Sequence, residues 1–181
     1  GTIDAAQFSA RVAQMLHRYP AGIVQGQLNL LDSHDVSRFL SLCGGDVRRL
    51  RLAEVFLFTS PGAPCVFYGD ELGIAGITET DYRSAMPWSD PPCAQQEFFR
   101  SLTSLRQENE ALVSGAFRSL WMEGSFYIYC RKFGDIAVIV ALNAGPAPVQ
   151  LPPSIAPSHS PILCHAYERG RVGPFGYVVW K

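Results

Sequence analysis

The residues best placed to do chemistry follow an apolar run early in the chain. Residues 28–31 are mostly apolar, and residues 32–38 directly after them are mostly polar or ionisable, with His34 and Asp35 at their centre. In α/β proteins, catalytic side chains emerge at the carboxyl ends of buried parallel strands, where a rigid scaffold holds them. The pattern therefore predicts that His34 and Asp35 lie at the mouth of a pocket. For such a pair taken alone, bonding to loop backbone groups is the commoner role.

The elements around this pair are predicted to be a strand, a helix and a second strand. Apolar residues at helical spacing predict a first helix over residues 4–18, which ends before a proline. Residues 23–31 then form a short apolar run typical of a buried strand. Asp46 is a good N-cap for a long apolar helix, and residues 64–68 predict a second buried strand. This order is the crossover unit of a parallel sheet, which is normally right-handed.

The second half of the chain has a different residue pattern. Residues 69–92 are rich in Gly, Pro and polar residues without a period, and loops of that length are generally functional. A helix with one apolar face is predicted over residues 94–108. Short strands separated by turn residues follow and predict a small antiparallel sandwich, with Trp121 and Trp180 in its core. The strands are residues 117–122, 126–132, 136–143, 149–151, 162–164 and 177–180.

Composition indicates a folded globular chain without an anionic polymer as partner. Hydrophobic residues make up 48% and charged residues 17%, which fits a chain with a sizeable core. Fifteen basic residues are balanced by sixteen acidic ones, and the net charge is -1. The one basic cluster, residues 48–51, is expected to be a solvated helix face. We therefore expect neither nucleic acid nor a membrane as partner.

The cysteines favour a reducing compartment. They are odd in number, widely spaced and without a C-x-x-C pair, which argues against a disulfide framework and against a zinc site. They are Cys43, Cys65, Cys93, Cys130 and Cys164. No apolar run approaches the length of a membrane span. The expectation is a cytoplasmic protein with free thiols, no metal and no other cofactor.

Three motifs together resemble the alpha-amylase superfamily of glycoside hydrolases. Residues 28–39 resemble the fourth conserved region of that family, residues 59–73 its last barrel strand and the following loop, and residues 81–88 the next loop on the substrate side. The motifs are most similar to the branch of cyclomaltodextrinases, neopullulanases and maltogenic amylases. The resemblance implies the C-terminal part of a (β/α)8 TIM barrel over residues 1–113, followed by an antiparallel β-sandwich C domain over residues 114–181.

The family's barrel is larger than this chain. A complete (β/α)8 barrel takes roughly 250 residues, whereas the chain has 181. In the family, the nucleophilic Asp follows the fourth strand and the acid/base Glu follows the fifth, so both would precede residue 1. The resemblance thus implies part of a retaining alpha-glycosidase for alpha-glucans such as maltooligosaccharides, cyclodextrins and pullulan, inactive alone. Open strand edges would be covered by the missing N-terminal barrel portion or by self-association.

The resemblance assigns roles to four residues. Asp35 would be the catalytic carboxylate that stabilises the transition state. His34 would bind hydroxyls of the distorted sugar, and Arg83 would bind the next sugar outward, unless it only forms an exposed salt bridge. Many relatives have an Asp four residues before this Arg, where the chain has Glu79, and Asp81 lies nearer in sequence. Which of the two carboxylates positions Arg83 stays open at this point.

Polar residues beside these motifs are expected to be structural. Asp32 and Arg38 flank the His-Asp pair and are predicted to brace its loop. Asp70 and Glu71 are adjacent in a loop and so are unsuited to converge on one bond, and we expect them to anchor that loop.

Two other classes of function remain as alternatives. A non-catalytic relative could keep the barrel as a scaffold for protein interaction, although the retained His34, Asp35 and Arg83 count against it. A metal-dependent phosphohydrolase could use a His-Asp dyad as ligands, although such dyads normally lie on helices with further His and Asp partners.

Overall fold

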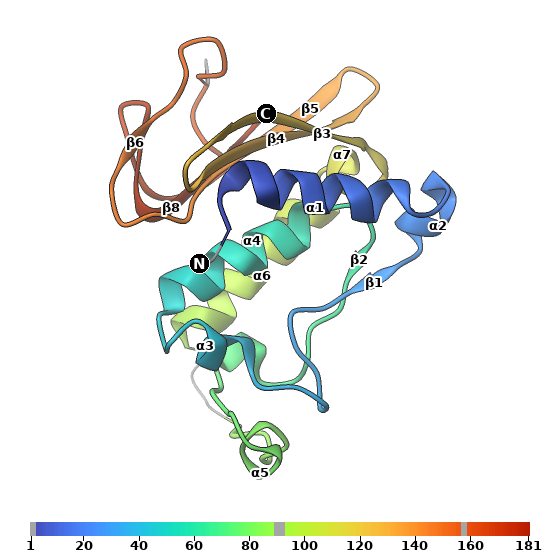
Figure 1. Cartoon of the computed structure of the whole chain (residues 1–181), viewed down its shortest axis with the longest axis vertical. Helices are drawn as coiled ribbons and strands as arrows, with labels where there is room; N and C mark the ends of the chain where they lie inside the picture. Colours follow the sequence, from blue (N-terminus) through green and yellow to red (C-terminus); the bar gives the residue numbers. More distant parts are fainter. Residues whose placement is uncertain (1–2, 89–92, 157–158) are drawn as a thin grey trace.

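The computed structural model describes residues 3–88, 93–156 and 159–181. Figure 1 shows a curled antiparallel sheet, made by the C-terminal part of the chain, and a layer of helices against it. A short parallel pair of strands lies beside the helices, and the segment labelled α5 projects at the end remote from the sheet. The loops that follow the parallel pair are thus held away from the antiparallel sheet.

Three long helices confirm the sequence prediction. α1 (Ala5–His17) begins after Asp4, whose side chain accepts a hydrogen bond from a backbone amide of the first turn. α4 (Val47–Thr59) begins after Asp46 in the same way, as predicted. α6 (Ala94–Gln107) buries one apolar face. In the described part of the chain, none of the helices is both long and apolar enough to cross a membrane.

The predicted parallel pair is present, but its strands are short. β1 (Leu28–Asn29) pairs in parallel with β2 (Ala63–Pro64). The strand prediction for residues 23–31 is wrong over its first part, where a short helix, α2 (Ala21–Gln25), occupies the chain. Pro20 is the N-cap of this helix. Apolar residues in a short run cannot distinguish a strand from a helix.

The expected burial of the two strands is also wrong. Leu28 is 67% exposed and Leu30 is 50% exposed, while Val66, inside the predicted strand over residues 64–68, is 38% exposed. Parallel strands are buried when helices and further strands cover them. In the described part of the chain, only β1 and β2 form this sheet. Their apolar side chains are therefore uncovered.

Short helices fill the connections. α3 (Phe39–Leu42) precedes α4 between the two parallel strands, so the predicted crossover unit is present. The predicted loop covers residues 69–92, of which 89–92 lie outside the described residues. Its described part carries two short elements, the 3-10 helix η1 (Asp70–Leu72) and α5 (Glu79–Tyr82). α7 (Glu110–Ser114) leads from α6 into the antiparallel sheet.

The predicted C-terminal strands form one hydrogen-bonded sheet. Its order is β3-β4-β5-β8-β6, with β7 also paired to β8, and all pairs are antiparallel. The long β8 pairs with β6 near its start and with β5 near its end. The expected sandwich is therefore built from a single sheet that curls on itself. The strands are β3 (Ala116–Glu123), β4 (Phe126–Phe133), β5 (Ile136–Asn143), β6 (Val149–Gln150), β7 (Leu163–Glu168) and β8 (Arg171–Trp180).

Buried apolar clusters cover both faces of the sheet. The larger one joins Leu102 and Leu112 of the helices to Tyr129 and Val140 of the sheet. All four are completely buried. The smaller cluster, around Ile128, lies under the curl. The helices and the sheet thus share one core, and the predicted domain division at residues 113 and 114 stays a prediction.

The two strand tryptophans have different surroundings. Trp180 is 3% exposed, which confirms its predicted place in the core. Trp121 is 38% exposed, so its prediction as a core residue is wrong. The pairing of β3 with β4 shifts register between Ser119 and Trp121. Such a shift changes the face on which the following side chains lie.

Candidate active site

Four side chains predicted from the sequence meet beyond the carboxyl end of β1. His34 and Asp35 lie in the loop after β1, while Glu79 begins α5 and Arg83 follows its last residue. Arg83 Nη2 lies 3.5 Å from Asp35 Oδ1, and Arg83 Nη1 lies 2.5 Å from Glu79 Oε1. Arg83 Nε donates to the His34 carbonyl at 2.9 Å, and His34 Nε2 lies 3.3 Å from Asp35 Oδ2. We call these four residues the Arg83 cluster.

The structure places Glu79, and not Asp81, against the guanidinium of Arg83. Glu79 and Arg83 are four residues apart across α5, a spacing at which side chains on a helix meet. Asp81 instead takes part in a capping box with Thr78 at the start of α5. The hydrogen bonds from Thr78 lower the pKa of Asp81 below its ordinary value. Its carboxylate is therefore committed to the helix start.

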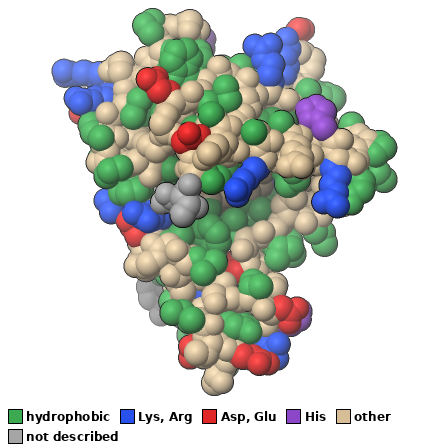
Figure 2. All heavy atoms as spheres, viewed as in Figure 1, with side chains coloured by type: hydrophobic (Ala, Val, Ile, Leu, Met, Phe, Trp, Pro, Cys, Tyr) green, Lys and Arg blue, Asp and Glu red, His purple; other side chains and the backbone are tan. Residues whose placement is uncertain are grey.

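The Arg83 cluster is open to solvent. The side chains of His34, Asp35 and Glu79 are each 67% exposed, and that of Arg83 is 46% exposed. Figure 2 shows acidic, basic and histidine side chains gathered at the lower tip of the molecule, the region labelled α5 in Figure 1. Exposed ion pairs are worth at most about 1 kcal/mol each and are screened by salt. A ligand could therefore exchange places with these contacts at little cost.

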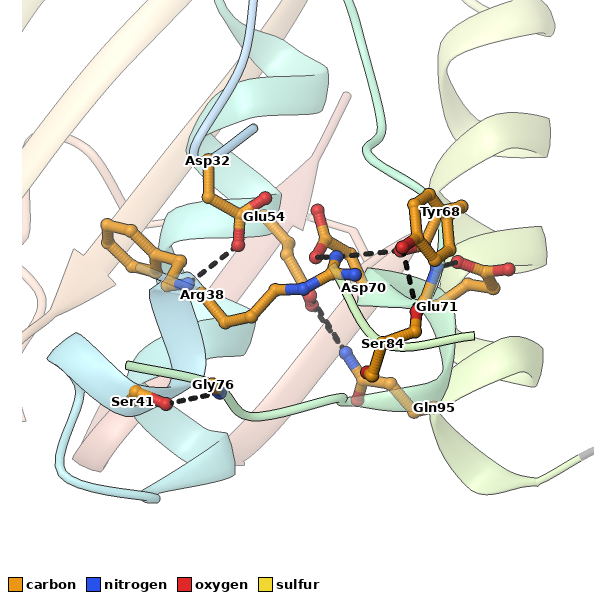
Figure 3. A network of polar contacts seen from close by, with 12 residues as sticks. Asp32, Arg38, Ser41, Glu54, Tyr68, Asp70, Glu71, Gly76, Ser84 and Gln95 are labelled. Carbon is orange, nitrogen blue, oxygen red and sulfur yellow. Dashed lines mark hydrogen bonds and ion pairs between the residues drawn. The ribbon is translucent and has the colours of Figure 1, made fainter. Parts of the chain in front are cut away.

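Asp32 and Arg38 form a buried brace beneath the cluster, as predicted (Figure 3). Asp32 is 2% exposed, and its Oδ2 accepts a hydrogen bond of 2.7 Å from the Phe39 amide. Arg38 is completely buried. Its Nη1 donates to the Tyr68 carbonyl at 2.7 Å and to Asp70 Oδ1 at 3.2 Å. The loop after β1 is thereby fixed to the turn after β2.

Asp70 and Glu71 anchor the turn after β2, as predicted. Burial, and after it the nearby Asp32, raise the pKa of Asp70 well above its usual range, against the opposing charge of Arg38. Glu71 accepts a hydrogen bond of 2.8 Å from the Gly69 amide. Gly69 has a φ of 92°, which side chains rarely adopt. The two acids serve the turn and do not converge on a common point outside it.

Glu54 on α4 was not singled out from the sequence. It is completely buried, and both of its carboxyl oxygens accept hydrogen bonds from Gln95 Nε2, at 2.9 and 2.8 Å. Gln95 Oε1 in turn accepts from Arg51 Nε at 3.0 Å. Burial raises the pKa of Glu54 to about 8. The sequence signal was a single acidic residue among the core-facing positions of an apolar helix.

Two exposed aromatic side chains lie in the segments that follow β2, and one of them, Tyr68, contacts the residue next to Arg83. Trp88 is 88% exposed and Tyr68 is 39% exposed. The hydroxyl of Tyr68 donates to the Ser84 carbonyl at 2.7 Å, next to Arg83. Exposed aromatic rings with a polar edge suit the apolar faces and hydroxyls of sugars.

None of the five cysteines belongs to the Arg83 cluster. All five cysteines are free. In the residues that the structure describes, no group of three or more His, Cys, Asp or Glu side chains could hold a metal ion. The Arg83 cluster thus presents carboxylates, an imidazole and a guanidinium, which together supply both donors and acceptors for hydroxyl groups.

Sequence comparisons identify the class of enzyme to which this arrangement is related. The alpha-amylase family, described as alpha amylase, catalytic domain, matches residues 2–107. The cyclomaltodextrinase of Geobacillus thermopakistaniensis is 34% identical over 155 residues, which cover 83% of this chain and 26% of that enzyme. Neopullulanase 2 of Thermoactinomyces vulgaris is 39% identical over 148 residues, which cover 79% of this chain and 25% of that enzyme. These relatives are glycoside hydrolases.

A solved structure agrees with this class. The cyclic alpha-maltosyl-(1→6)-maltose hydrolase of Arthrobacter globiformis, in complex with cyclic alpha-maltosyl-(1→6)-maltose, superimposes with a TM-score of 0.85 at 29% identity. The match covers 99% of this chain and 41% of that one. The chain belongs to the alpha-amylase family. It spans about a quarter of the length of the two curated relatives named above.

Proposed function

We propose that the chain is the C-terminal portion of a retaining alpha-glycosidase that acts on alpha-glucans, and that Asp35 is its transition-state-stabilising carboxylate. The observation that carries the proposal is the place of Asp35 beyond the end of β1, between the imidazole of His34 and the guanidinium of Arg83. The Asp35 side chain is 67% exposed and is therefore reachable from solvent.

The chemistry gives this third carboxylate a defined task. Cleavage of a glycosidic bond passes through an oxocarbenium-like state, and retaining enzymes use a nucleophile and an acid/base to reach and resolve it. A fixed negative charge beside the sugar stabilises the developing positive charge, more strongly once the substrate excludes water. In this proposal Asp35 supplies that charge.

The other members of the cluster bind sugar. His34 would hydrogen-bond hydroxyls of the sugar that is distorted, through its two ring nitrogens. Arg83 would bind the neighbouring sugar, because its planar set of donors matches vicinal hydroxyls. Glu79 would hold the guanidinium of Arg83 in place, as the contact between them supports.

The nucleophile and the acid/base would come from barrel segments outside this chain. The relatives, about four times as long, support this view, as does the exposure of Leu28, Leu30 and Val66 around the parallel pair. Further barrel strands, or a second copy of this chain, would cover that apolar surface.

The names of the relatives support the substrate class. They are a cyclomaltodextrinase and a neopullulanase, and the solved structure holds a cyclic maltosyl-maltose. We propose maltooligosaccharides, cyclodextrins and pullulan as substrates of the complete enzyme. Five free thiols support a reducing, cytoplasmic location.

The test is the release of reducing sugar from maltotriose, cyclodextrin and pullulan. We expect turnover by the full-length protein and none by the isolated chain. The isolated chain would lack two of the three catalytic carboxyl groups, the nucleophile and the acid/base. If the isolated chain showed turnover and Asp35→Ala abolished it, the proposal that the nucleophile and the acid/base lie outside this chain would be wrong. A full-length protein without turnover on any of the three would favour the scaffold function instead.

A further inference from the structure

Arg38 is the most deeply buried charged residue next to the Arg83 cluster, and it lies three positions after Asp35 in the chain. It is completely buried, and its guanidinium carbon lies 4.0 Å from the centre of the Phe67 ring and 4.9 Å from that of the Tyr68 ring. Arginine stacks on aromatic rings through its flat delocalised group, a contact that the lysine ammonium cannot reproduce. The guanidinium is thus packed against both aromatic rings.

The polar contacts of Arg38 reach two other segments of the site. Its Nη1 donates to the Tyr68 carbonyl and to Asp70 in the turn after β2. Its backbone amide donates to the Gly76 carbonyl at 2.9 Å. The segment around Gly76 leads directly into α5, which carries Glu79. One residue therefore contacts both the turn after β2 and the approach to α5.

Neighbours of Arg38 strengthen the second of these contacts. Ser41 Oγ accepts a hydrogen bond of 2.8 Å from the Gly76 amide, as Figure 3 shows. Ser37 Oγ donates to the Ile77 carbonyl at 3.1 Å. Gly76 also fits closely, because a Cβ there would lie 2.8 Å from the Tyr82 amide nitrogen. Hydrogen bonds thus hold the segment before α5 against the start of α3.

A second connection runs through Tyr68. Its carbonyl accepts from Arg38, and its hydroxyl donates to the Ser84 carbonyl at 2.7 Å. Ser84 follows Arg83 in the chain. The two ends of α5 are therefore both joined to Arg38, one through its backbone amide at Gly76 and the other through its guanidinium by way of Tyr68.

The exposed contacts of the Arg83 cluster cannot fix its geometry by themselves. Each is a surface ion pair or a single hydrogen bond, worth at most about 1 kcal/mol. A sugar that binds Asp35 or Arg83 would have to replace them. When these exposed contacts are broken, the buried contacts of Arg38 still set the positions of the loop and of α5.

We propose that Arg38 is a positioning residue for the proposed glycosidase site: it holds the loop of His34 and Asp35 in register with α5, which carries Glu79 and Arg83. The catalytic role of Arg38 rests on the proposed function. Its structural role, holding the loop and α5 in register, concerns this chain alone. Because a displacement of about 1 Å can cost about a hundredfold in rate, loss of this register acts on turnover more than on substrate affinity.

The structural part is tested by hydrogen exchange in the full 181-residue chain. In Arg38→Lys, exchange of the Phe39 and Gly76 amides is expected to rise about tenfold or more, because local opening becomes easier. The amides of Tyr129 and Val140 in the sheet should keep their protection. Arg48→Lys, at an exposed arginine of α4, is the matched control and should change amide exchange neither at Phe39 and Gly76 nor at the two sheet residues.

Two outcomes would overturn the structural part. One is unchanged exchange at Phe39 and Gly76 in Arg38→Lys, and the other is an equal rise at the sheet amides. If Arg38→Lys does not fold, Tyr68→Phe decides the question, since it removes a partly exposed hydroxyl only. It should raise exchange at the Arg83 amide without changing Phe39, and no change at Arg83 would count against the connection.

The catalytic part is tested in the full-length enzyme. Arg38→Lys should lower kcat about tenfold to a hundredfold with KM changed only a few-fold, measured at a temperature at which the variant is folded. A raised KM with normal kcat would contradict a positioning role. A wild-type enzyme without glycosidase activity would refute the proposed function, while the exchange experiment would still decide whether Arg38 sets the register.

Discussion

Replacement of the buried Glu54 by glutamine should change how the stability of the chain depends on pH. Burial raises the pKa of Glu54 from 4.5 to about 8, and the charges of Asp70 and Asp32 add to the effect. The hydrogen bond from Gln95 and the charge of Arg51 oppose it. The folded chain therefore keeps a proton on Glu54 at neutral pH, whereas the unfolded chain has lost it.

The sign of the pH dependence follows from proton binding. Between pH 4.5 and about 8 the folded state binds one proton more than the unfolded state at Glu54. The free energy of unfolding therefore falls as pH rises through this window. At about 1.36 kcal/mol for each pKa unit, the full effect of this group is roughly 5 kcal/mol, complete above pH 8. Asp70, whose pKa is also raised, acts in the same direction.

The assay is urea unfolding of the wild type and Glu54→Gln at pH 5, 6, 7 and 8. Glutamine has nearly the same shape and can keep a hydrogen bond with Gln95, but it does not titrate. We expect the variant to lose about 1 kcal/mol less stability per pH unit than the wild type. Glu97→Gln, at a side chain that is 61% exposed on α6, is the matched control and should behave as the wild type. Equal slopes for wild type and Glu54→Gln would refute the reasoning.

Three further predictions concern assembly, stability and sugar binding. The isolated chain should self-associate in size-exclusion chromatography with light scattering, because Leu28 and Leu30 are exposed; a monodisperse monomer with protected amides at residues 28–31 would contradict this. Arg131→Met should lower the free energy of unfolding by about 3 kcal/mol in urea, since the carbonyls of Gly115 and Thr59 lose their buried donor, and an unchanged midpoint would refute that. In the full-length enzyme, His34→Ala should raise KM with a milder loss of kcat than Asp35→Asn, because it removes hydrogen bonds and no charge; an equal loss of kcat would contradict the assigned role.

Signals that act within a few residues were sufficient to predict the three long helices, whereas the short helix α2 overlaps a predicted strand. The helix start at Asp46 follows from a side chain that bonds the backbone two residues later. The turns between β3, β4 and β5 follow similarly from turn residues, whereas β8, predicted over residues 177–180, begins at Arg171. These features do not depend on what the rest of the chain does.

Features that depend on distant partners were predicted less well. The exposure of Leu28 follows from the absence of further strands beside β1 in the described residues, which an apolar run does not reveal. The side of β3 on which Trp121 lies depends on a register shift against β4. Glu54 was missed because its meaning comes from Gln95, 41 residues away in the chain.

The sequence named four residues of the candidate site but not their arrangement, and their roles stay predictions. The family motifs indicated His34, Asp35, Arg83 and Glu79, and the structure brings the four together. The choice of Glu79 over Asp81 depended on the start of α5, where Asp81 bonds the helix cap. The sequence alone did not show which of the two carboxylates lies against Arg83.

The measurement that tests the central claim most directly is steady-state turnover of a full-length Asp35→Asn enzyme on a cyclodextrin and on maltotriose. The two side chains have nearly the same volume, so the change removes a charge that matters mainly as positive charge develops on the sugar. We predict that kcat falls by about three orders of magnitude with the melting temperature unchanged. A correctly folded Asp35→Asn enzyme with near wild-type kcat would contradict the account and leave Asp35 as a loop residue.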